Sequence, residues 1–100
     1  MKRLVSLLVV LVASSAMAHR EAARINSGSE LRDLCKEESE EALIGKGLAP
    51  FNWSASYWDQ GNVLMVKGKW SVNGSSVTVQ CRIARGDEAR FATMSIEDSQ

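Results

Sequence analysis

Residues 64–83 read LMVKGKWSVNGSSVTVQCRI, and the predicted architecture is built around this segment. Its centre, Asn73-Gly74, is typical of a two-residue hairpin loop, because a type I′ turn needs positive φ at both central positions. Apolar residues occupy even positions before the loop and odd positions after it: Leu64, Val66, Trp70 and Val72, then Val77, Val79, Cys81 and Ile83. A two-residue loop brings both sets to one face, in these pairs: Val72–Ser75, Trp70–Val77, Gly68–Val79, Val66–Cys81 and Leu64–Ile83. A four-residue loop would shift the pairs but keep the same face apolar.

A further strand-like run precedes the hairpin at residues 52–59 and is followed by a turn at 59–62. Pairing Trp58 with Val63 sends three residues of this run to the apolar face: Trp53, Ala55 and Tyr57. In that register we expect the ring of Trp53 to cover the gap that Gly68 leaves in the neighbouring strand.

A fourth strand is predicted after the hairpin. Residues 85–88 read RGDE, which is typical of a polar turn. Pairing Ala84 with Ala89 across this turn places three later residues inside: Ala92, Met94 and Ile96. The four runs therefore predict an antiparallel meander with one apolar face.

A helix is predicted before the strands, over residues 29–44. Ser27 and Glu30 form a capping box, and Gly45 supplies a left-handed stop. At 3.6 residues per turn, four residues share the buried stripe: Leu31, Leu34, Cys35 and Ala42. Glu38 falls within this stripe, which leaves two interpretations. Either the helix rolls enough for Glu38 to reach solvent or an arginine, or Glu38 is a functional carboxylate.

Cys35 and Cys81 are the only cysteines, and both are predicted on buried surfaces that face each other. In an oxidising compartment two such cysteines form an intramolecular disulfide by default. A metal site or a free thiol are the alternatives, but two cysteines without a nearby histidine cannot complete a zinc site.

The first eighteen residues have the three parts of a secretory signal peptide. Lys2 and Arg3 are followed by an apolar run at 4–12 and by the small-residue motif Ala16-Met17-Ala18. The apolar run is too short to span a membrane. The sequence therefore predicts a signal peptide (1–18), an N-terminal arm (19–28) and a single α+β domain (29–97), in a periplasmic or secreted protein without a membrane span in its mature form.

The predicted mature chain carries ten basic and twelve acidic residues, a net charge of −2. This balance gives no reason to expect nucleic acid or an anionic membrane as a partner. The same alternation that defines the apolar face also leaves a cluster on the outer face, with an aromatic and arginine composition typical of binding hot spots. We name these residues the outer patch: Trp58, Val63, Met65, Arg82 and Phe91. The alternative interpretation is that the arm or the loop before residue 52 folds over them.

No catalytic or cofactor motif stands out, so we expect neither an enzyme nor a bound cofactor or metal. His19 is the only histidine, which excludes sites that need two imidazoles. As residue one of the mature chain it resembles the start of the copper-dependent polysaccharide monooxygenases. That family also has a second histidine and a much larger sandwich domain, and both are missing here.

The order of one helix followed by four strands resembles the repeat of the β-lactamase inhibitory proteins. The likeness is of element order, and it carries no residue role or activity to this chain. From the outer patch we expect a non-enzymatic binding or adaptor module, with an inhibitor as one form of it, that contacts a protein partner or another copy of itself. The alternatives are glycan or peptidoglycan recognition by Trp58 and its neighbours and, last, a small enzyme that uses Glu38.

Overall fold

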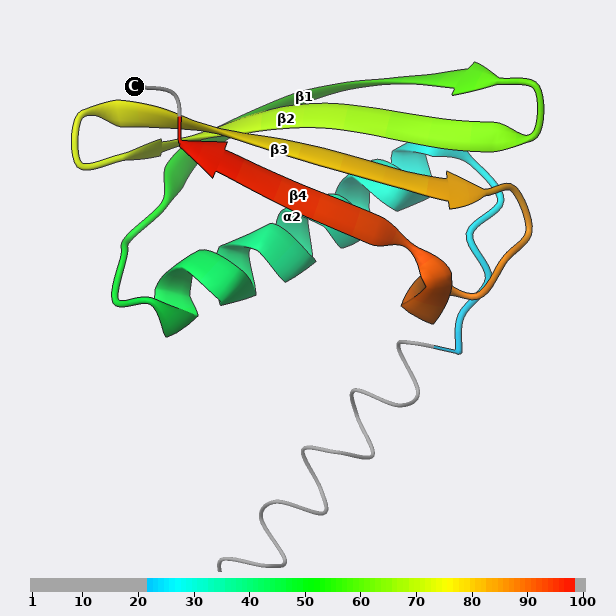
Figure 1. Ribbon diagram of the computed structural model, residues 1–100, viewed down its shortest axis with the longest axis horizontal. Helices are drawn as coiled ribbons and strands as arrows, with labels where there is room; N and C mark the ends of the chain where they lie inside the picture. Colours follow the sequence, from blue (N-terminus) through cyan, green and yellow to red (C-terminus); the bar gives the residue numbers. More distant parts are fainter. Residues whose placement is uncertain (1–21, 99–100) are drawn as a thin grey trace, which may run out of the picture.

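The computed structural model describes residues 22–98, so the predicted signal peptide (1–18) lies outside the described residues. The elements follow in this order: helix α2 (Gly28–Gly45), strands β1 (Phe51–Gln60), β2 (Val63–Val72) and β3 (Ser75–Ala84), the 3₁₀ helix η1 (Ala89–Phe91) and strand β4 (Thr93–Asp98). The strands form an antiparallel sheet in the order β1-β2-β3-β4, and α2 lies across one face of it (Figure 1). The predicted fold, one helix on a four-stranded meander, is confirmed.

The central hairpin has the predicted register. Val72 pairs with Ser75, and every expected pair follows back to Leu64 with Ile83. Asn73 and Gly74 both have positive φ, at 50° and 80°, as the two-residue turn requires. The apolar face of this hairpin is buried under α2, because alternate residues of a strand point to opposite faces.

The register between β1 and β2 differs from the prediction by two residues. Trp58 pairs with Met65 rather than with Val63, and the turn contains only Gly61 and Asn62. Gly61 has a φ of 60°, which lets the chain reverse in two residues. A shift of two keeps every side chain on its predicted face, and Trp53 still lies directly over Gly68, where an added Cβ would meet its ring.

The start of β4 is also two residues later than predicted, because η1 is inserted before it. Thr93 pairs with Arg82, and Ile96 pairs with Val79. Ala92 and Ile96 pack against the core as expected. The prediction that Met94 lies inside is wrong: its side chain faces the helix side but is 38% exposed, since β4 is an edge strand.

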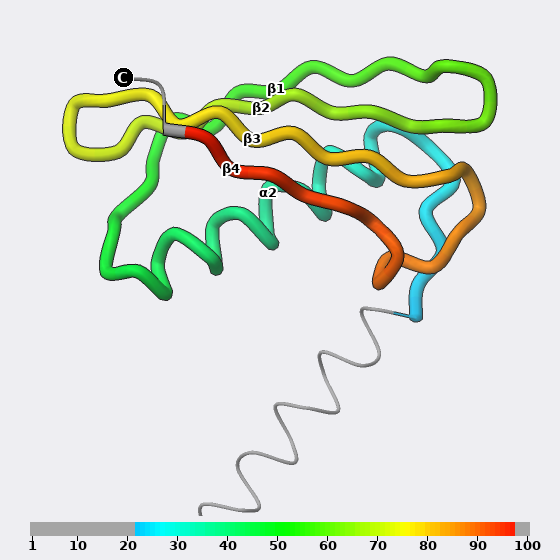
Figure 2. Tube along the Cα trace, viewed as in Figure 1, coloured from blue at the N-terminus to red at the C-terminus, as the bar shows by residue number. Residues whose placement is uncertain are grey.

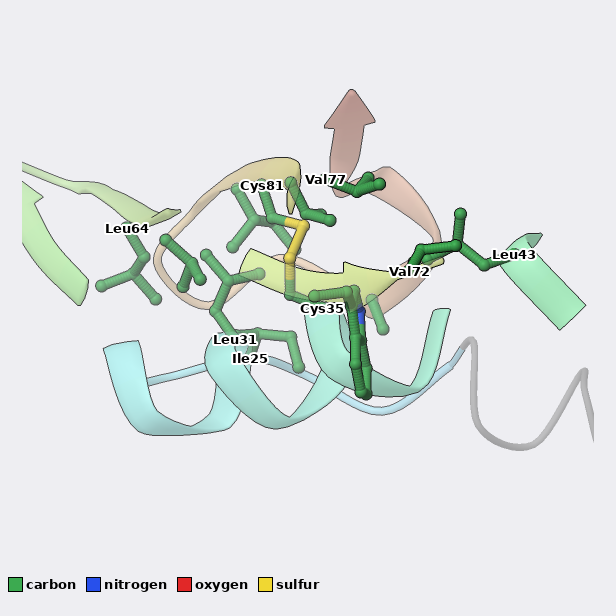
Figure 3. Packing of buried hydrophobic residues seen from close by; sticks show 13 residues of the cluster. Ile25, Leu31, Cys35, Leu43, Leu64, Val72, Val77 and Cys81 are labelled. Carbon is green, nitrogen blue, oxygen red and sulfur yellow. A yellow bond between two sulfur atoms is a disulfide. The ribbon is translucent and has the colours of Figure 1, made fainter. Parts of the chain in front are cut away.

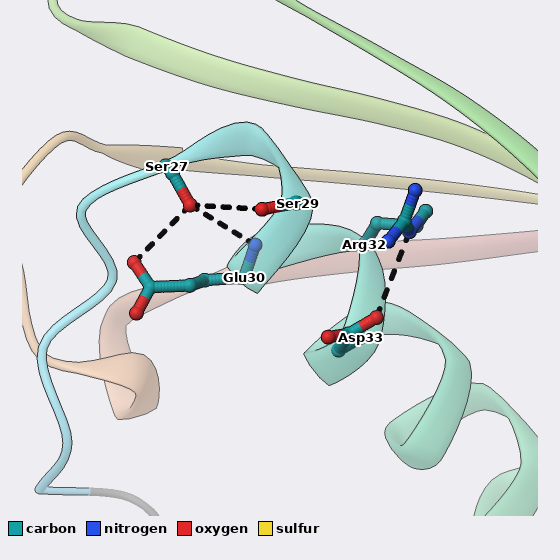
Figure 4. A network of polar contacts seen from close by, with 5 residues as sticks. All are labelled: Ser27, Ser29, Glu30, Arg32 and Asp33. Carbon is teal, nitrogen blue, oxygen red and sulfur yellow. Dashed lines mark hydrogen bonds and ion pairs between the residues drawn. The ribbon is translucent and has the colours of Figure 1, made fainter.

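Helix α2 begins as the capping box predicts. The Ser27 hydroxyl accepts a hydrogen bond from the Glu30 amide (Figure 4). The Glu30 carboxylate accepts another from the backbone amide of Asn26. The helix end differs from the prediction, because Gly45 is still helical and Gly47 takes the left-handed conformation, with a φ of 82°. The Leu48 amide then bonds to the carbonyl of Leu43, which closes a Schellman motif.

The buried line of α2 is an i, i+4 series: Leu31, Cys35, Ser39 and Leu43. Leu34 and Ala42 flank this line and are half-buried, as is Glu38. Ser39 has no exposed surface, and its hydroxyl accepts a hydrogen bond of 2.8 Å from the indole nitrogen of Trp70. The same hydroxyl donates to the carbonyl of Cys35 at 2.6 Å. A polar pair therefore lies within the helix–sheet interface, fully hydrogen-bonded, as buried polar groups require.

Cys35 and Cys81 form the predicted disulfide, which joins the middle of α2 to β3. The bond lies within the hydrophobic core, where Leu31 of the helix and Leu64 of the sheet pack around it (Figure 3). Its position follows from two periodicities, because the helix stripe and the strand alternation each point one cysteine into the same layer.

The described part of the N-terminal arm lies beside the connection between β3 and η1 (Figure 2). Arg24 forms a β-bridge with Glu88. The amide and carbonyl of Ile25 bond to the carbonyl of Asp87 and the amide of Gly86, at 2.9 and 2.7 Å. Ile25 is buried in the core. The arm thus extends the hydrophobic core at one end of the sheet.

Breaking the disulfide should lower stability strongly. The cysteines are 46 positions apart, and closing a loop of that length is worth about 4 kcal/mol in the chain-entropy model. For a domain of this size we expect Tm to fall by roughly 15 °C or more, either on reduction or in Cys81→Ser. Calorimetry with and without reductant checks this, and the double variant with both cysteines replaced should melt like the reduced protein. An unchanged melt on reduction would contradict the pairing.

Removing the Ser39 hydroxyl should leave the Trp70 indole N–H buried without an acceptor. We expect Ser39→Ala to lower the free energy of unfolding by about 1–3 kcal/mol in urea titrations. In a Trp70→Phe background the same substitution should cost clearly less, since no donor is then left unpaired. Equal losses in both backgrounds would show that the hydrogen bond contributes nothing.

Candidate functional site

The helix-free face of the sheet brings part of the outer patch into one cross-strand row. Trp58 of β1 pairs with Met65 of β2, Met65 pairs with Arg82 of β3, and Arg82 pairs with Thr93 of β4. These side chains point away from α2, because their immediate neighbours along each strand face the core. The Trp58 side chain is 42% exposed. An aromatic ring, a thioether and a guanidinium are therefore adjacent on one surface.

A hollow of about 160 Å³ lies over this row. It is lined by Trp58, Met65, Val66, Gln80, Cys81, Arg82, Thr93, Met94 and Ser95. Trp58 stands at one side, and the polar groups of Gln80, Thr93 and Ser95 lie toward the other, across β3 and β4. Its lining contains no carboxylate, so the fixed charge of the hollow is positive.

Arg82 differs from the other arginines of the described chain. The Arg24 guanidinium donates a hydrogen bond to the Gly86 carbonyl. The Arg32 guanidinium lies 3.6 Å from the Asp33 carboxylate and also over the ring of Tyr57. Two further pairs are short: Arg85 with Asp59 and Arg90 with Glu88, each at 2.6 Å. Within residues 22–98, the Arg82 side chain has neither an ion pair nor a hydrogen bond. Its guanidinium donors are available to a ligand.

Charge is segregated between the two faces of the molecule. Lys67 and Lys69 follow Met65 on the outer face of β2, and together with Arg82 they give this face three cations. Glu97 of β4 is the one carboxylate at an outward position of the described strands. Helix α2, on the opposite side, contains six acidic and two basic residues. The outer face is therefore positive and the helix side negative.

Two members of the predicted outer patch lie outside the row. Val63 is half-buried and pairs with Gln60 and Ala84. It lies two residues before Met65 on β2, next to the turn between β1 and β2. Phe91 is exposed, but it belongs to η1 and not to β4, and the Arg90 guanidinium lies 5.2 Å from its ring centre. The prediction that Phe91 sits beside Arg82 in the strand register is wrong, because the turn after β3 is longer than expected.

Sequence reasoning missed the residues that complete the hollow. The predicted pairing of Ala84 with Ala89 places Phe91, not Thr93, opposite Arg82, and nothing in the sequence distinguishes Gln80 from other outward polar residues. Polar residues alternate with apolar ones from Thr93 to Glu97, so their outward direction was visible in the sequence. Their distance from Arg82 was not, since it depends on the length of the preceding turn.

The described arm and Glu38 both lie away from the hollow. The described arm pairs with residues 86–89 and does not lie over Trp58. Glu38 is on α2, on the far side of the sheet from Arg82, so the two do not share a pocket. Within residues 22–98, no three His, Cys, Asp or Glu side chains are grouped to hold a metal ion.

Trp58 should report on the outer face by fluorescence. Trp70 is 3% exposed and Trp53 is half-buried over Gly68, which leaves Trp58 as the tryptophan most open to solvent. We expect Trp58→Phe to lower the acrylamide quenching constant at least two-fold and to shift the emission maximum to shorter wavelength. If Trp53→Phe has the larger effect on quenching, the assigned orientation of β1 is wrong.

None of the helices in the described residues has the length and apolar character that crossing a membrane requires. Comparisons with protein-family models, with curated proteins and with solved structures found no match for this chain. Arguments about function therefore rest on the outer face itself, with its exposed Trp58, its available Arg82 and its excess of positive charge.

Proposed function

We propose that this protein is an exported, non-enzymatic binding module whose outer sheet face contacts a protein partner. The observation that carries the proposal is the row of Trp58, Met65 and Arg82. These residues combine a flat aromatic ring, a flexible apolar side chain and an arginine without a partner in the described chain. Tryptophan and arginine are the residues that most often dominate binding energy at protein interfaces.

The partner surface should be acidic around an apolar centre. Arg82, Lys67 and Lys69 together attract carboxylates, while Met65 and Trp58 offer the apolar contact area that a hydrophobic side chain of the partner would cover. A hollow of about 160 Å³ has room for one large side chain. An acidic segment with a single apolar anchor therefore fits both the charge and the shape of this face.

Glycan recognition is the second candidate, and the hollow itself favours it. One wall is the ring of Trp58, on which a sugar face can stack, and Gln80, Thr93 and Ser95 supply polar groups opposite. The lack of a carboxylate in the lining counts against this candidate, since acidic side chains that accept bonds from sugar hydroxyls would be expected there. We propose protein binding first for this reason.

Export is part of the same proposal. The signal-peptide pattern at 1–18 and the Cys35–Cys81 disulfide both favour an oxidising compartment, so the partner is expected in the periplasm or outside the cell. A binding role needs no cofactor, and we place catalysis by Glu38 last because Glu38 lies on α2, on the other side of the sheet from the hollow.

Affinity capture from envelope extract tests the proposal, with wild-type protein and Trp58→Ala as baits and a direct titration of the recovered partner. We expect Trp58→Ala to weaken binding about 30-fold or more, as loss of a central aromatic contact does. Arg82→Glu should weaken it further, because the introduced carboxylate repels an acidic partner. Higher salt should weaken wild-type binding more than binding by Arg82→Ala.

The matched control is Ile44→Ala, which trims a side chain of similar exposure on the helix side. It should bind like the wild type. The proposal would be refuted if wild type, Trp58→Ala and Arg82→Glu recovered the same partner proteins in equal amounts. Sedimentation with purified peptidoglycan, lost in Trp58→Ala while no protein partner is captured, would favour the glycan candidate instead.

A further inference from the structure

Strand β1 is an open edge of the sheet. It has ten residues and pairs with β2 alone, so within residues 22–98 no strand lies beside the backbone groups on its other side. Eight of the ten residues are exposed, and the side chains of Tyr57 and Trp58 are 46% and 42% exposed. From Ser54 to Gln60 the pairing with β2 continues without a register shift. This edge is therefore long, regular and accessible to another strand.

Beyond the register shift between Phe51 and Ser54, this edge has few of the features that normally keep strands apart, and its one charged residue is Asp59. Residues 51–58 read FNWSASYW and contain no charged residue and no proline. Natural edge strands are usually protected by lysine, proline, a bulge or short length. The opposite edge has such protection, because β4 is only six residues long and ends with Glu97 and Asp98. The β1 edge is therefore more accessible to a further strand than the β4 edge.

We propose that β1 pairs with β1 of a second copy of this chain, so that two four-stranded sheets join into one antiparallel sheet of eight strands. An antiparallel pair with a two-fold axis perpendicular to the sheet is self-complementary, because each strand offers the same edge to the other. In this arrangement directly opposed residues point to the same face. Both helices therefore lie on one side of the joined sheet.

The side chains of β1 suit this pairing. An axis at Tyr57, the middle of the regular segment, opposes Ser56 to Trp58 of the other copy on the outer face. Asp59 then faces Ala55 of the other copy on the helix side, while it keeps its ion pair with Arg85. No charge meets a like charge across the junction. A partner strand of different sequence would need to match this aromatic edge, whereas a second copy does so by symmetry.

The expected contact is modest. Seven paired residues span about 24 Å at roughly 3.4 Å per residue, which places the junction at the low end of specific interfaces, below about 1,200 Å² in total. We therefore expect a dimer that dissociates in the micromolar range. The dimer would carry two outer faces, and so two copies of the Trp58–Arg82 hollow, on one continuous surface.

Sedimentation velocity on the exported, purified protein tests the inference over a concentration series. We expect a monomer–dimer equilibrium, and amide hydrogen exchange that slows with protein concentration in residues 54–60. A monomer up to several hundred micromolar would overturn the inference. The inference would also be overturned if amide exchange slowed with protein concentration only in β4 or on the outer face, because the copies would then associate through another surface.

Introducing a charged side chain at Ser56 tests the β1–β1 pairing most directly. Ser56, Lys67 and Gln80 occupy one cross-strand row, so a control charge can be placed beside the same lysine, away from the edge. Ser56→Glu adds a carboxylate beside Lys67 at the edge, and Gln80→Glu adds the same group beside Lys67 in the centre of the sheet. We expect Ser56→Glu to raise the dimer dissociation constant at least ten-fold and Gln80→Glu to change it less than two-fold. Ser56→Lys should act like Ser56→Glu, while all variants keep a cooperative melt. Unchanged dimerisation in both Ser56 variants would refute the pairing.

Discussion

The burial of one sheet face under a single helix is the constraint on which the rest of the structure depends. Cys35 and Cys81 join the two layers covalently, and Ser39 and Trp70 join them by a hydrogen bond inside the same interface. Since the chain is small, its core is thin and needs this additional support. The covalent and polar links lie on neighbouring positions of α2, so they hold the helix in one orientation across the strands.

The two faces of the sheet therefore differ in function: one forms the core with α2, and the other is exposed. All the large buried side chains of β2 and β3 are used on the helix side, which leaves the outer face without a structural task. A row such as Trp58, Met65 and Arg82 on that face does little for the fold, because its side chains remain exposed or half-exposed. The segregation of charge adds to the contrast: acidic residues gather on α2, and the cations of β2 and β3 gather on the other side.

The edges of the sheet show a similar difference. The β4 edge is short and acidic, and η1 precedes it, whereas the β1 edge is long and carries one charged residue, Asp59, which is paired with Arg85. Protection of an edge is needed only where pairing would be harmful. Joining copies through β1 would leave the outer face open and would double it, so self-association and binding of a partner are compatible uses of one molecule.

Four features could be predicted from the sequence alone: the central hairpin, the face of every strand residue that the alternation covers, the start of the helix and the disulfide. These depend on local periodicity and on turn residues such as Asn73 and Gly74, which act over short distances. Only the tertiary structure decided the pairing of β1 and of β4, the burial of Ser39 and the position of Phe91 in η1. A shift of two residues leaves the alternation intact, so periodicity cannot detect it, and the length of each turn sets it instead. For the same reason the sequence placed Trp58, Met65 and Arg82 on one face, but their alignment with Thr93 around a hollow required the folded chain.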